Sequence, residues 1–149
     1  MTHSIEPVLT IVTVNKNSGT HLNRTTNNIF CLLHKFSNLK WLIIDGISTD
    51  SNEFLLSQVS RNVLFKDKIF IHIGKDTGIY NAMNIAIKLV ETPFLLFINS
   101  GDIIDVNFFE IVLNQLTNRK DSYVFAYNTF ENKFKLSCNN LVIRFISYI

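Results

Sequence analysis

The chain has 149 residues, 47% of them hydrophobic and 17% charged, which fits one domain with a buried core and excludes a disordered chain. Its formal net charge is +2, from 14 basic and 12 acidic residues scattered along the sequence, so a nucleic-acid partner is not expected. No apolar run approaches the ~20 residues that a membrane-spanning helix requires.

The first half of the chain alternates predicted strands with predicted helices. Val8–Val14 is strongly β-branched, which predicts a buried strand. His21–Phe36 has apolar residues at helical spacing and predicts a helix. Leu39–Asp45 predicts the second strand and Asn52–Ser60 the second helix. The residues expected to be buried on these two helices are Leu22, Ile29, Leu32, Leu33, Phe36, Phe54, Leu55 and Val59.

The second half continues the alternation. Ile69–Ile73 predicts a third strand, and a helix is expected from about Ile79 to Glu91. Phe94–Ile98 predicts the fourth strand, Asp105 is expected to cap a further helix, and Ser122–Asn128 predicts a fifth strand. The residues expected to be buried on these two helices are Ile79, Met83, Ala86, Val90, Phe108, Ile111, Val112 and Leu116.

Alternating strands and helices predict an α/β fold, with a mostly parallel sheet and helices on both faces. We expect one domain over residues 1–128, with residues 129–149 as an apolar extension of it. The segment Leu141–Ile149 has no partner in the pattern. It is expected either to pack on the sheet or to form a homodimer or membrane-edge contact.

The two cysteines and the first residues suggest a compartment. Cys31 and Cys138 lack the spacing of a metal site and fit a reducing environment. Met1–Pro7 lacks the basic and apolar regions of a signal peptide. We therefore expect a cytoplasmic protein, with a peripheral position at the inner membrane as the second option.

Two predicted strands run directly into a polar turn that contains an aspartate. These segments are Trp41–Asp50, with Asp45, and Phe94–Asp102, with Asp102 at its end. Parallel strands deliver such residues to the carboxyl edge of a sheet, where open α/β folds bind ligands. Either segment can also be an ordinary turn whose acid is satisfied by backbone amides. Asp50 is expected to be a helix cap rather than a ligand.

Asp76–Asn84 is the third polar segment. Gly78 permits a sharp turn or a close approach to a ligand, and the helix that follows would point its free amides at the same edge. The alternative is an ordinary capped helix, which we accept for Met83 and Ala86. A nucleoside diphosphate at this edge would be neutralised by a hard divalent ion bound to carboxylate and phosphate oxygens.

Four segments, in this order, resemble the inverting family-two glycosyltransferases with the GT-A fold. Leu9–Asn15 looks like the family's first strand, and Ile44–Asp50 is similar to its Val-Asp-Asp/Gly-Gly-Ser-Thr-Asp element. Asp76–Asn84 and Phe97–Asp102 resemble elements of a bacterial branch that builds surface polysaccharides. The resemblance implies a three-layer, Rossmann-like nucleotide-sugar-binding half.

The resemblance also implies a nucleotide-sugar donor, most often a UDP-sugar, a divalent metal, Mn²⁺ or Mg²⁺, and a glycan or lipid-linked acceptor. By position, Asp45 would contact the base, Asn99 would lie near the ribose, and Asp102 would approach the metal. The donor site implied in this way consists of Val14, Asn15, Asp45, Asp76, Gly78, Tyr80, Asn84, Asn99 and Ser100.

The sequence departs from the family pattern at several positions. Asn99 and Gly101 stand where many relatives carry aspartates, Asn81 replaces an aspartate, and Gly74 stands where a glutamate is common. Family members usually continue into a further half that carries the acceptor site and the general base. We expect this chain to lack that half, so no catalytic base is assigned.

Three functions remain open from the sequence. The first is a glycosyltransferase, and the second is a truncated, catalytically silent nucleotide-sugar-binding module that acts through oligomerisation. The third is a different nucleotide chemistry, such as nucleotidyl transfer, on a similar sheet. The third is least favoured because no glycine- and basic-rich phosphate loop follows the first strand.

Overall fold

The computed structural model describes residues 7–118, 124–127 and 134–137. The elements in chain order are β1 (Leu9–Asn15), α1 (His21–Lys35), β2 (Leu39–Asp45), α2 (Asn52–Ser60), the 3₁₀ turn η1 (Val63–Phe65), β3 (Ile69–Ile73), α3 (Ile79–Leu89), β4 (Phe94–Asn99), α4 (Val106–Asn118), β5 (Val124–Tyr127) and β6 (Phe134–Ser137). Of the predicted C-terminal extension, only β6 is described. The contact segment Leu141–Ile149 and Cys138 lie outside the described residues.

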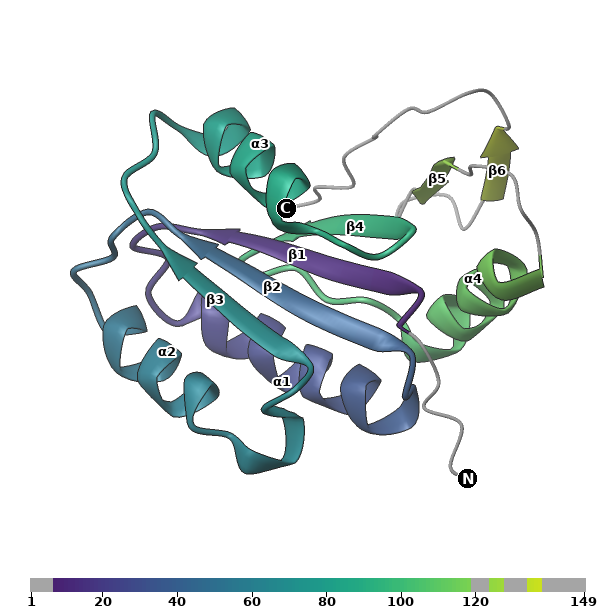
Figure 1. Cartoon of the computed structure of the whole chain (residues 1–149), viewed down its shortest axis with the longest axis horizontal. Helices are drawn as coiled ribbons and strands as arrows, with labels where there is room; N and C mark the ends of the chain where they lie inside the picture. The colour runs from purple at the N-terminus through teal and green to yellow at the C-terminus, as the bar shows by residue number, and fades with distance from the viewer. Residues whose placement is uncertain (1–6, 119–123, 128–133, 138–149) are drawn as a thin grey trace.

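The main sheet has four strands in the order β3-β2-β1-β4, and all three pairings are parallel. β5 and β6 form a separate antiparallel pair. Helices α1 and α2 lie on one face of the main sheet and α3 lies on the other (Figure 1). The predicted α/β fold, with a parallel sheet covered on both faces, is confirmed.

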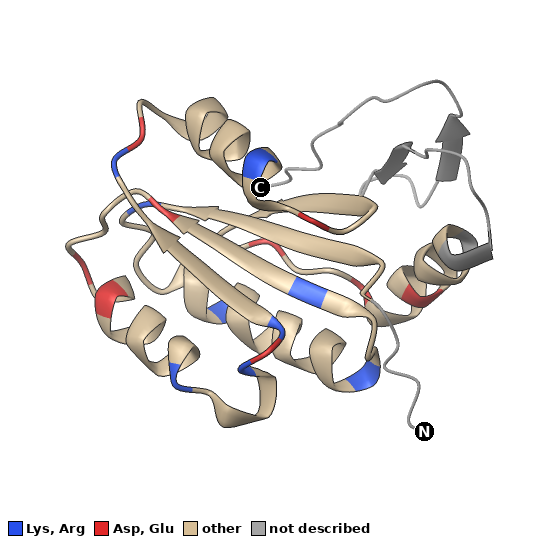
Figure 2. Ribbon diagram, viewed as in Figure 1, with Lys and Arg blue, Asp and Glu red and all other residues tan. Residues whose placement is uncertain are grey.

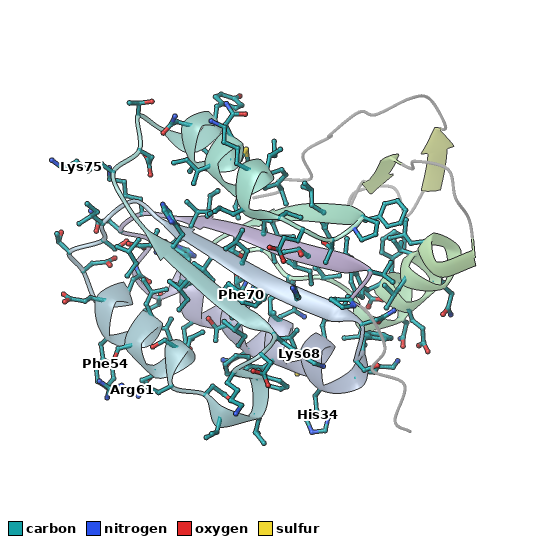
Figure 3. The ribbon with its side chains drawn as sticks, in the orientation of Figure 1. His34, Phe54, Arg61, Lys68, Phe70 and Lys75 are labelled. Atoms are coloured by element: carbon teal, nitrogen blue, oxygen red, sulfur yellow. The ribbon has the colours of Figure 1, made fainter. Side chains whose placement is uncertain are left out.

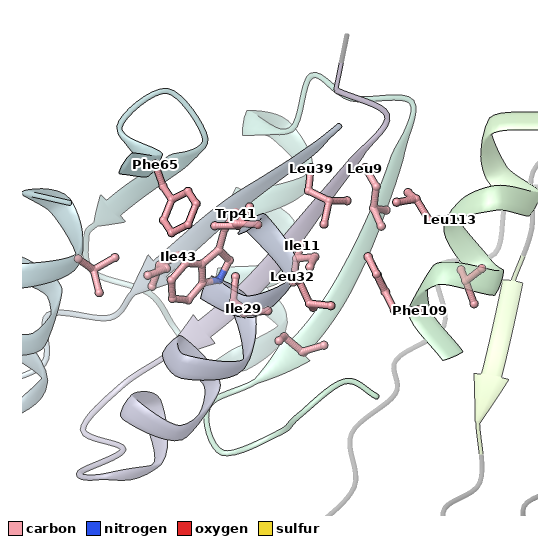
Figure 4. Close-up of a cluster of buried hydrophobic side chains, with 14 of the residues drawn as sticks. Leu9, Ile11, Ile29, Leu32, Leu39, Trp41, Ile43, Phe65, Phe109 and Leu113 are labelled. Atoms are coloured by element: carbon pink, nitrogen blue, oxygen red, sulfur yellow. The ribbon is translucent and has the colours of Figure 1, made fainter. Parts of the chain in front are cut away.

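The larger core lies between the sheet and helices α1, α2 and α4 (Figure 4). Trp41 is fully buried at its centre, and its indole Nε1–H donates to Thr13 Oγ1 at 3.0 Å. The ring of Phe30 on α1 meets Trp41 edge-on, with the ring centroids 6.2 Å apart. This core uses alternate residues of the strands, as expected for β-strands whose two faces both bury side chains.

The second core is smaller and lies under α3. Met83 and Ala86 pack there against Val12, Ile44 and Phe97 of three different strands. Since α3 is the only described helix on this face, the edge strand β3 is less covered, and Phe70 keeps 45% of its surface exposed (Figure 3). Among the described residues, no helix combines the length and the apolar character needed to cross a membrane.

Three residues that we expected in helix cores are exposed. Phe54, which Figure 3 labels on α2, is 70% exposed, Ile79 is 48% exposed and Ile111 is 56% exposed. In α2, Val59 is buried as predicted and Leu56 is buried as well, because a helix of nine residues is too short for its apolar spacing to define one face. The predicted cap of α4 is confirmed, since Asp105 Oδ1 accepts the Phe108 N–H at 2.7 Å.

Candidate functional site

The register of the sheet brings the ends of its strands to one edge. Asn15, the last residue of β1, is paired with Asp45, the last residue of β2. On the other side of β1, Val14 is paired with Asn99 at the end of β4. Asp45 is also paired with Ile73, where β3 ends. The three polar segments predicted from the sequence therefore leave the sheet at the same edge.

The side chain of Asn15 joins three of the loops at this edge. It is 5% exposed, and its Nδ2 donates to Asp45 Oδ2 at 2.6 Å and to Ser48 Oγ at 3.2 Å. Its Oδ1 accepts hydrogen bonds from Ser18 Oγ at 2.6 Å and Ser100 Oγ at 2.7 Å. Both donors and both acceptor positions of the amide are used, so Asn15 acts as a clamp between the loops after β1, β2 and β4.

Asp45 is a buried carboxylate whose oxygens are occupied within the protein. It is 1% exposed, and Oδ1 accepts the Ser48 N–H at 2.7 Å. Oδ2 accepts the Ser48 hydroxyl at 2.7 Å together with the Asn15 amide. These contacts agree with the interpretation of Asp45 as the acid of an ordinary turn, whose oxygens are satisfied within the protein. A contact between Asp45 and a nucleotide base stays a prediction.

The turn after Asp45 has an unusual backbone at Ile47. Its φ angle is +60°, in the left-handed region that a β-branched residue rarely adopts, and its side chain is 43% exposed. In the family element that this segment resembles, glycine stands at this position. The turn therefore carries conformational strain beside the buried Asp45–Ser48 bonds.

Replacing Ile47 by glycine is expected to raise the free energy of unfolding by about 1 kcal/mol, because glycine adopts a positive φ without steric cost. Urea denaturation followed by circular dichroism measures the change. Val63 is the matched control, since it is also β-branched, is 80% exposed and is not among the residues with positive φ. Val63→Gly should lower stability, and equal loss in both variants would contradict the strain at Ile47.

The loop before α3 packs directly against the tip of β2. Asp76 Oδ1 accepts the Gly78 N–H at 2.9 Å, while the other carboxylate oxygen lies against Gly46, where an added Cβ would collide with it. Gly78 has φ +126° and immediately precedes α3. Figure 2 shows acidic positions at the end of β2 and in this loop on the same side of the sheet. Asp76 thus links the N-terminus of α3 to the strand ends.

The remaining residues predicted to bind the nucleotide-sugar donor differ in their exposure. Tyr80 and Asn84 are exposed on the first turns of α3. Val14 packs its side chain in the core under α3, so only its backbone faces the site, where Val14 O accepts the Ser100 hydroxyl at 3.4 Å. The structure therefore brings Asn15, Asp45 and Ser100 into one hydrogen-bonded group and leaves Tyr80 and Asn84 at its margin.

The turn from Asn99 to Asp102 is closed by its own hydrogen bonds. The Asp102 N–H donates to Asn99 O at 3.1 Å, and Asp102 Oδ2 accepts the Asn99 N–H at 3.0 Å. Gly101, with φ +103°, provides the backbone conformation that the turn needs. The side-chain oxygen Oδ1 of Asn99 is buried and has no hydrogen-bond partner in the described part of the chain.

Asp102 combines partial burial with a nearby cation. Burial raises the pKa of its carboxyl group, and the Asn99 N–H and the Arg24 guanidinium act in the opposite direction. No described residue donates a hydrogen bond to Oδ1 of Asp102. The Asn99–Asp102 turn thus contains two oxygens without a described hydrogen-bond donor, this one and the buried Oδ1 of Asn99.

The oxygens of this turn meet part of what a divalent metal needs. No group of three or more histidine, cysteine or acidic side chains with the geometry of a metal site occurs in the described ranges. Mg²⁺ and similar hard cations are often bound by one or two carboxylates, with substrate phosphates supplying further oxygens. Asp102, together with the unpartnered Asn99 Oδ1, fits a metal held mainly by a diphosphate and does not fit an all-protein metal centre.

The loop after β1 contains residues whose roles the sequence did not reveal. Asn17 has φ +48°, and its Oδ1 accepts the Thr49 N–H at 2.8 Å. Asp50 accepts the Gly19 N–H at 2.8 Å and the Asn52 N–H at 3.0 Å. Desolvation favours the neutral form of Asp50, but the hydrogen bonds from Gly19 and Asn52 outweigh it and lower its pKa. Ser51, not Asp50, holds the N-cap position of α2, and the Asp50 carboxylate joins the first residue of that helix to the loop after β1.

Comparisons with known proteins identify a family for this chain and solved structures with a similar fold. The family model described as glycosyl transferase family 2 matches residues 10–137. No curated protein matches the chain. Among solved structures, the mannosyltransferase PcManGT from Pyrobaculum calidifontis, in complex with GDP-Man and Mn²⁺, is similar with a TM-score of 0.66 and 13% identity, over 80% of this chain and 35% of that one.

A second similar structure is S. aureus TarS 1–349 in complex with UDP-GlcNAc. Its TM-score is 0.60 at 18% identity, over 78% of this chain and 33% of that chain. TarS 1–349 in complex with UDP gives a TM-score of 0.59 at 17% identity. At these identities the likeness concerns the fold, and the chain spans about a third of the length of these structures.

Proposed function

The chain belongs to glycosyltransferase family 2, and from this membership we propose that it binds a nucleotide sugar at the carboxyl edge of its sheet and transfers the sugar to a glycan or lipid-linked acceptor. One observation carries the proposal. Hydrogen bonds and contacts join the ends of β1, β2 and β4 to the turn before α3, through Asn15 and Asp76. Open α/β sheets bind ligands at such an edge.

The N-terminus of α3 is suited to the diphosphate of the donor. The free amides and the positive end of a helix favour an anion within its first turn. Asp76 holds the turn before this helix against Gly46, so the N-terminus of α3 lies at the same edge as the Asn99–Asp102 turn. We therefore assign the diphosphate to the space between α3 and that turn.

We assign the metal to the Asn99–Asp102 turn. Asp102 Oδ1 and Asn99 Oδ1 would hold a Mn²⁺ or Mg²⁺ ion together with the diphosphate oxygens. A divalent ion in this position supplies charge neutralisation for the diphosphate as a leaving group. Asn15 and Asp45 are buried, and the hydrogen bonds of their side chains hold the loops of this edge together.

Transfer itself requires an acceptor hydroxyl to attack the anomeric carbon of the sugar. The bond from that carbon to the diphosphate oxygen breaks, and the hydroxyl proton passes to a general base within hydrogen-bond reach. In the inverting family that the sequence resembles, the attack comes from the face opposite the diphosphate. None of the described carboxylates is assigned as this base.

Isothermal titration calorimetry with UDP-, GDP- and dTDP-sugars tests the proposal. We expect binding of a UDP-sugar in the presence of Mn²⁺ and weaker binding with EDTA, because the diphosphate would lose the cation that neutralises its charge. Release of the free nucleoside diphosphate on prolonged incubation would show transfer or hydrolysis. Absence of binding to every sugar nucleotide in the panel would contradict the proposal.

A nucleotide-sugar-binding module without transfer is the second candidate. It rests on the described residues, in which oxygens for a nucleotide sugar and its metal can be named, whereas no carboxylate is assigned as the general base of transfer. Binding without release of nucleoside diphosphate would select this candidate over the enzyme. The homodimer predicted for this module is checked by multi-angle light scattering, and a monomeric mass would remove that part of it.

A further inference from the structure

The N-terminal half of α1 holds the loop that contains Asp102. Thr25 is fully buried, its Oγ1 accepts the Gly101 N–H at 2.8 Å, and its hydroxyl donates to Asp102 O at 2.9 Å. One turn further along, Asn28 Oδ1 accepts the Ile104 N–H at 2.7 Å and Asn28 Nδ2 donates to Ile104 O at 3.0 Å. The Thr25 hydroxyl also lies 3.4 Å from Asn99 O, so five hydrogen bonds connect two side chains of α1 to the backbone of one loop.

A third residue of α1 lies against the same loop. A Cβ added to Gly101 would lie 3.3 Å from Nδ1 of His21, so the imidazole covers the glycine closely. His21, Thr25 and Asn28 are spaced by four and three residues, which puts them on one face of the helix. This face meets the Asn99–Asp102 turn and the residues that follow it.

The neighbouring threonine shows that the bonds of Thr25 are specific. Thr26 is also buried, yet its hydroxyl donates to Leu22 O at 2.8 Å within the same helix. That is the usual behaviour of threonine inside a helix. Thr25 instead bonds across 76 and 77 positions of sequence to Gly101 and Asp102. Since glycine is the residue with the greatest backbone freedom, a fixed partner for the Gly101 N–H restricts the turn.

We propose that Thr25 and Asn28 are positioning residues that set the orientation of the Asp102 carboxylate toward a metal–diphosphate ligand. This inference rests on the proposed function. Thr25 touches neither ligand nor metal in this scheme. It acts through the backbone of Gly101 and Asp102, while Asp102 Oδ2 is fixed by the Asn99 N–H and Oδ1 is left for the ligand.

Three variants test the proposal. Thr25→Val keeps the shape of the side chain and removes the hydrogen bonds between its hydroxyl and the loop. Thr25→Ser keeps the hydroxyl. Thr26→Val removes a buried hydroxyl that does not reach the loop. Calorimetry measures the affinity of each for UDP and GDP, with Mn²⁺ and with EDTA. We expect Thr25→Val to bind the preferred diphosphate about five- to tenfold more weakly with Mn²⁺, as for the loss of one or two hydrogen bonds.

With EDTA the same variant should bind within about twofold of the wild type, since a metal-free diphosphate does not depend on Asp102. Thr25→Ser and Thr26→Val should match the wild type in both conditions. Equal affinities for Thr25→Val and Thr26→Val, or an equal loss with and without Mn²⁺, would overturn the positioning role. If Thr25→Val does not fold, Asn28→Ala is used, with an expected loss of about two- to threefold with Mn²⁺ alone.

Amide hydrogen exchange without ligand separates failure of this inference from failure of the proposed function. Thr25→Val should exchange faster than the wild type at Gly101 and Asp102, and Thr26→Val should not. Unchanged exchange in Thr25→Val would show that Thr25 does not hold the turn, whatever the protein binds. Faster exchange in a protein whose wild type binds neither UDP nor GDP would overturn the proposed function, and the positioning role with it.

Discussion

Replacing Asn15 by aspartate is expected to make the protein lose about 3 kcal/mol of stability at pH 7 while costing little at pH 4. The new carboxylate would take the place of an amide nitrogen that lies 2.6 Å from Asp45 Oδ2. Asp45 is 1% exposed, so water screens the repulsion poorly. The variant replaces the amide nitrogen of residue 15 by a carboxylate oxygen and keeps the shape of the side chain.

The direction of the pH dependence follows from the two carboxyl groups sharing one site. They cannot both be ionised, so in the folded variant the pKa of one of them is raised above the value of about 3.9 for an unfolded aspartate. A raised pKa gives stability that is present below the unfolded value and is lost as the pH rises through the folded one. A shift of about two units corresponds to about 3 kcal/mol.

Urea denaturation at pH 4, 5.5 and 7 measures the effect for Asn15→Asp and the wild type. Asn27→Asp is the matched control, because it makes the same chemical change at an exposed position of α1. The difference between control and wild type should not widen with pH. A stability loss for Asn15→Asp that is the same at all three pH values would contradict the contact between Asn15 and Asp45.

Replacing Asp102 by asparagine is expected to weaken Mn²⁺-dependent binding of a nucleoside diphosphate by about two orders of magnitude, or about 2.7 kcal/mol. Asparagine keeps the oxygen that accepts the Asn99 N–H but loses the negative charge that attracts the metal. Calorimetry with UDP and Mn²⁺ measures the loss. Binding with EDTA should remain close to that of the wild type.

The fold should tolerate this change. Burial raises the pKa of Asp102, which means that the folded protein disfavours its charged form, so a neutral side chain is not expected to lower stability at neutral pH. Asp105→Asn is the control, since Asp105 is exposed and asparagine can also cap α4. Metal-dependent binding that survives in Asp102→Asn would show that Asp102 is not the metal ligand.

The bounds of the strands in the main sheet could be predicted closely from the local sequence. Leu39–Asp45 and Ile69–Ile73 have the predicted bounds, β4 is one residue longer than predicted, and β1 is shifted by one residue at both ends. β-branched and aromatic runs bounded by polar turns give a strong signal, and in β1 and β2 it reflects burial on both faces of the strand. The parallel pairing follows from the strand–helix alternation, since a crossover helix returns each strand in the same direction. The order β3-β2-β1-β4 is known only from the structure.

The helix faces and the site were less accessible from sequence. Ile79 has the spacing of a core residue, but it stands at the first position of α3, beyond the cover that the sheet provides, and it is 48% exposed. Thr25 has no sequence signal at all, because its partners lie in a loop far along the chain. Periodicity describes one element at a time, whereas these contacts depend on two.

The residues alone determined that this chain forms a parallel α/β sheet and that Asp45, Asp76 and Asp102 leave it at one edge, because apolar patterning and strand ends are local properties. Only the tertiary structure decided what each acid does there. Both oxygens of Asp45 accept hydrogen bonds from Asn15 or Ser48, whereas no described residue donates a hydrogen bond to Oδ1 of Asp102. The same carboxylate is a turn acid or a ligand according to the donors that surround it, and those donors come from distant segments.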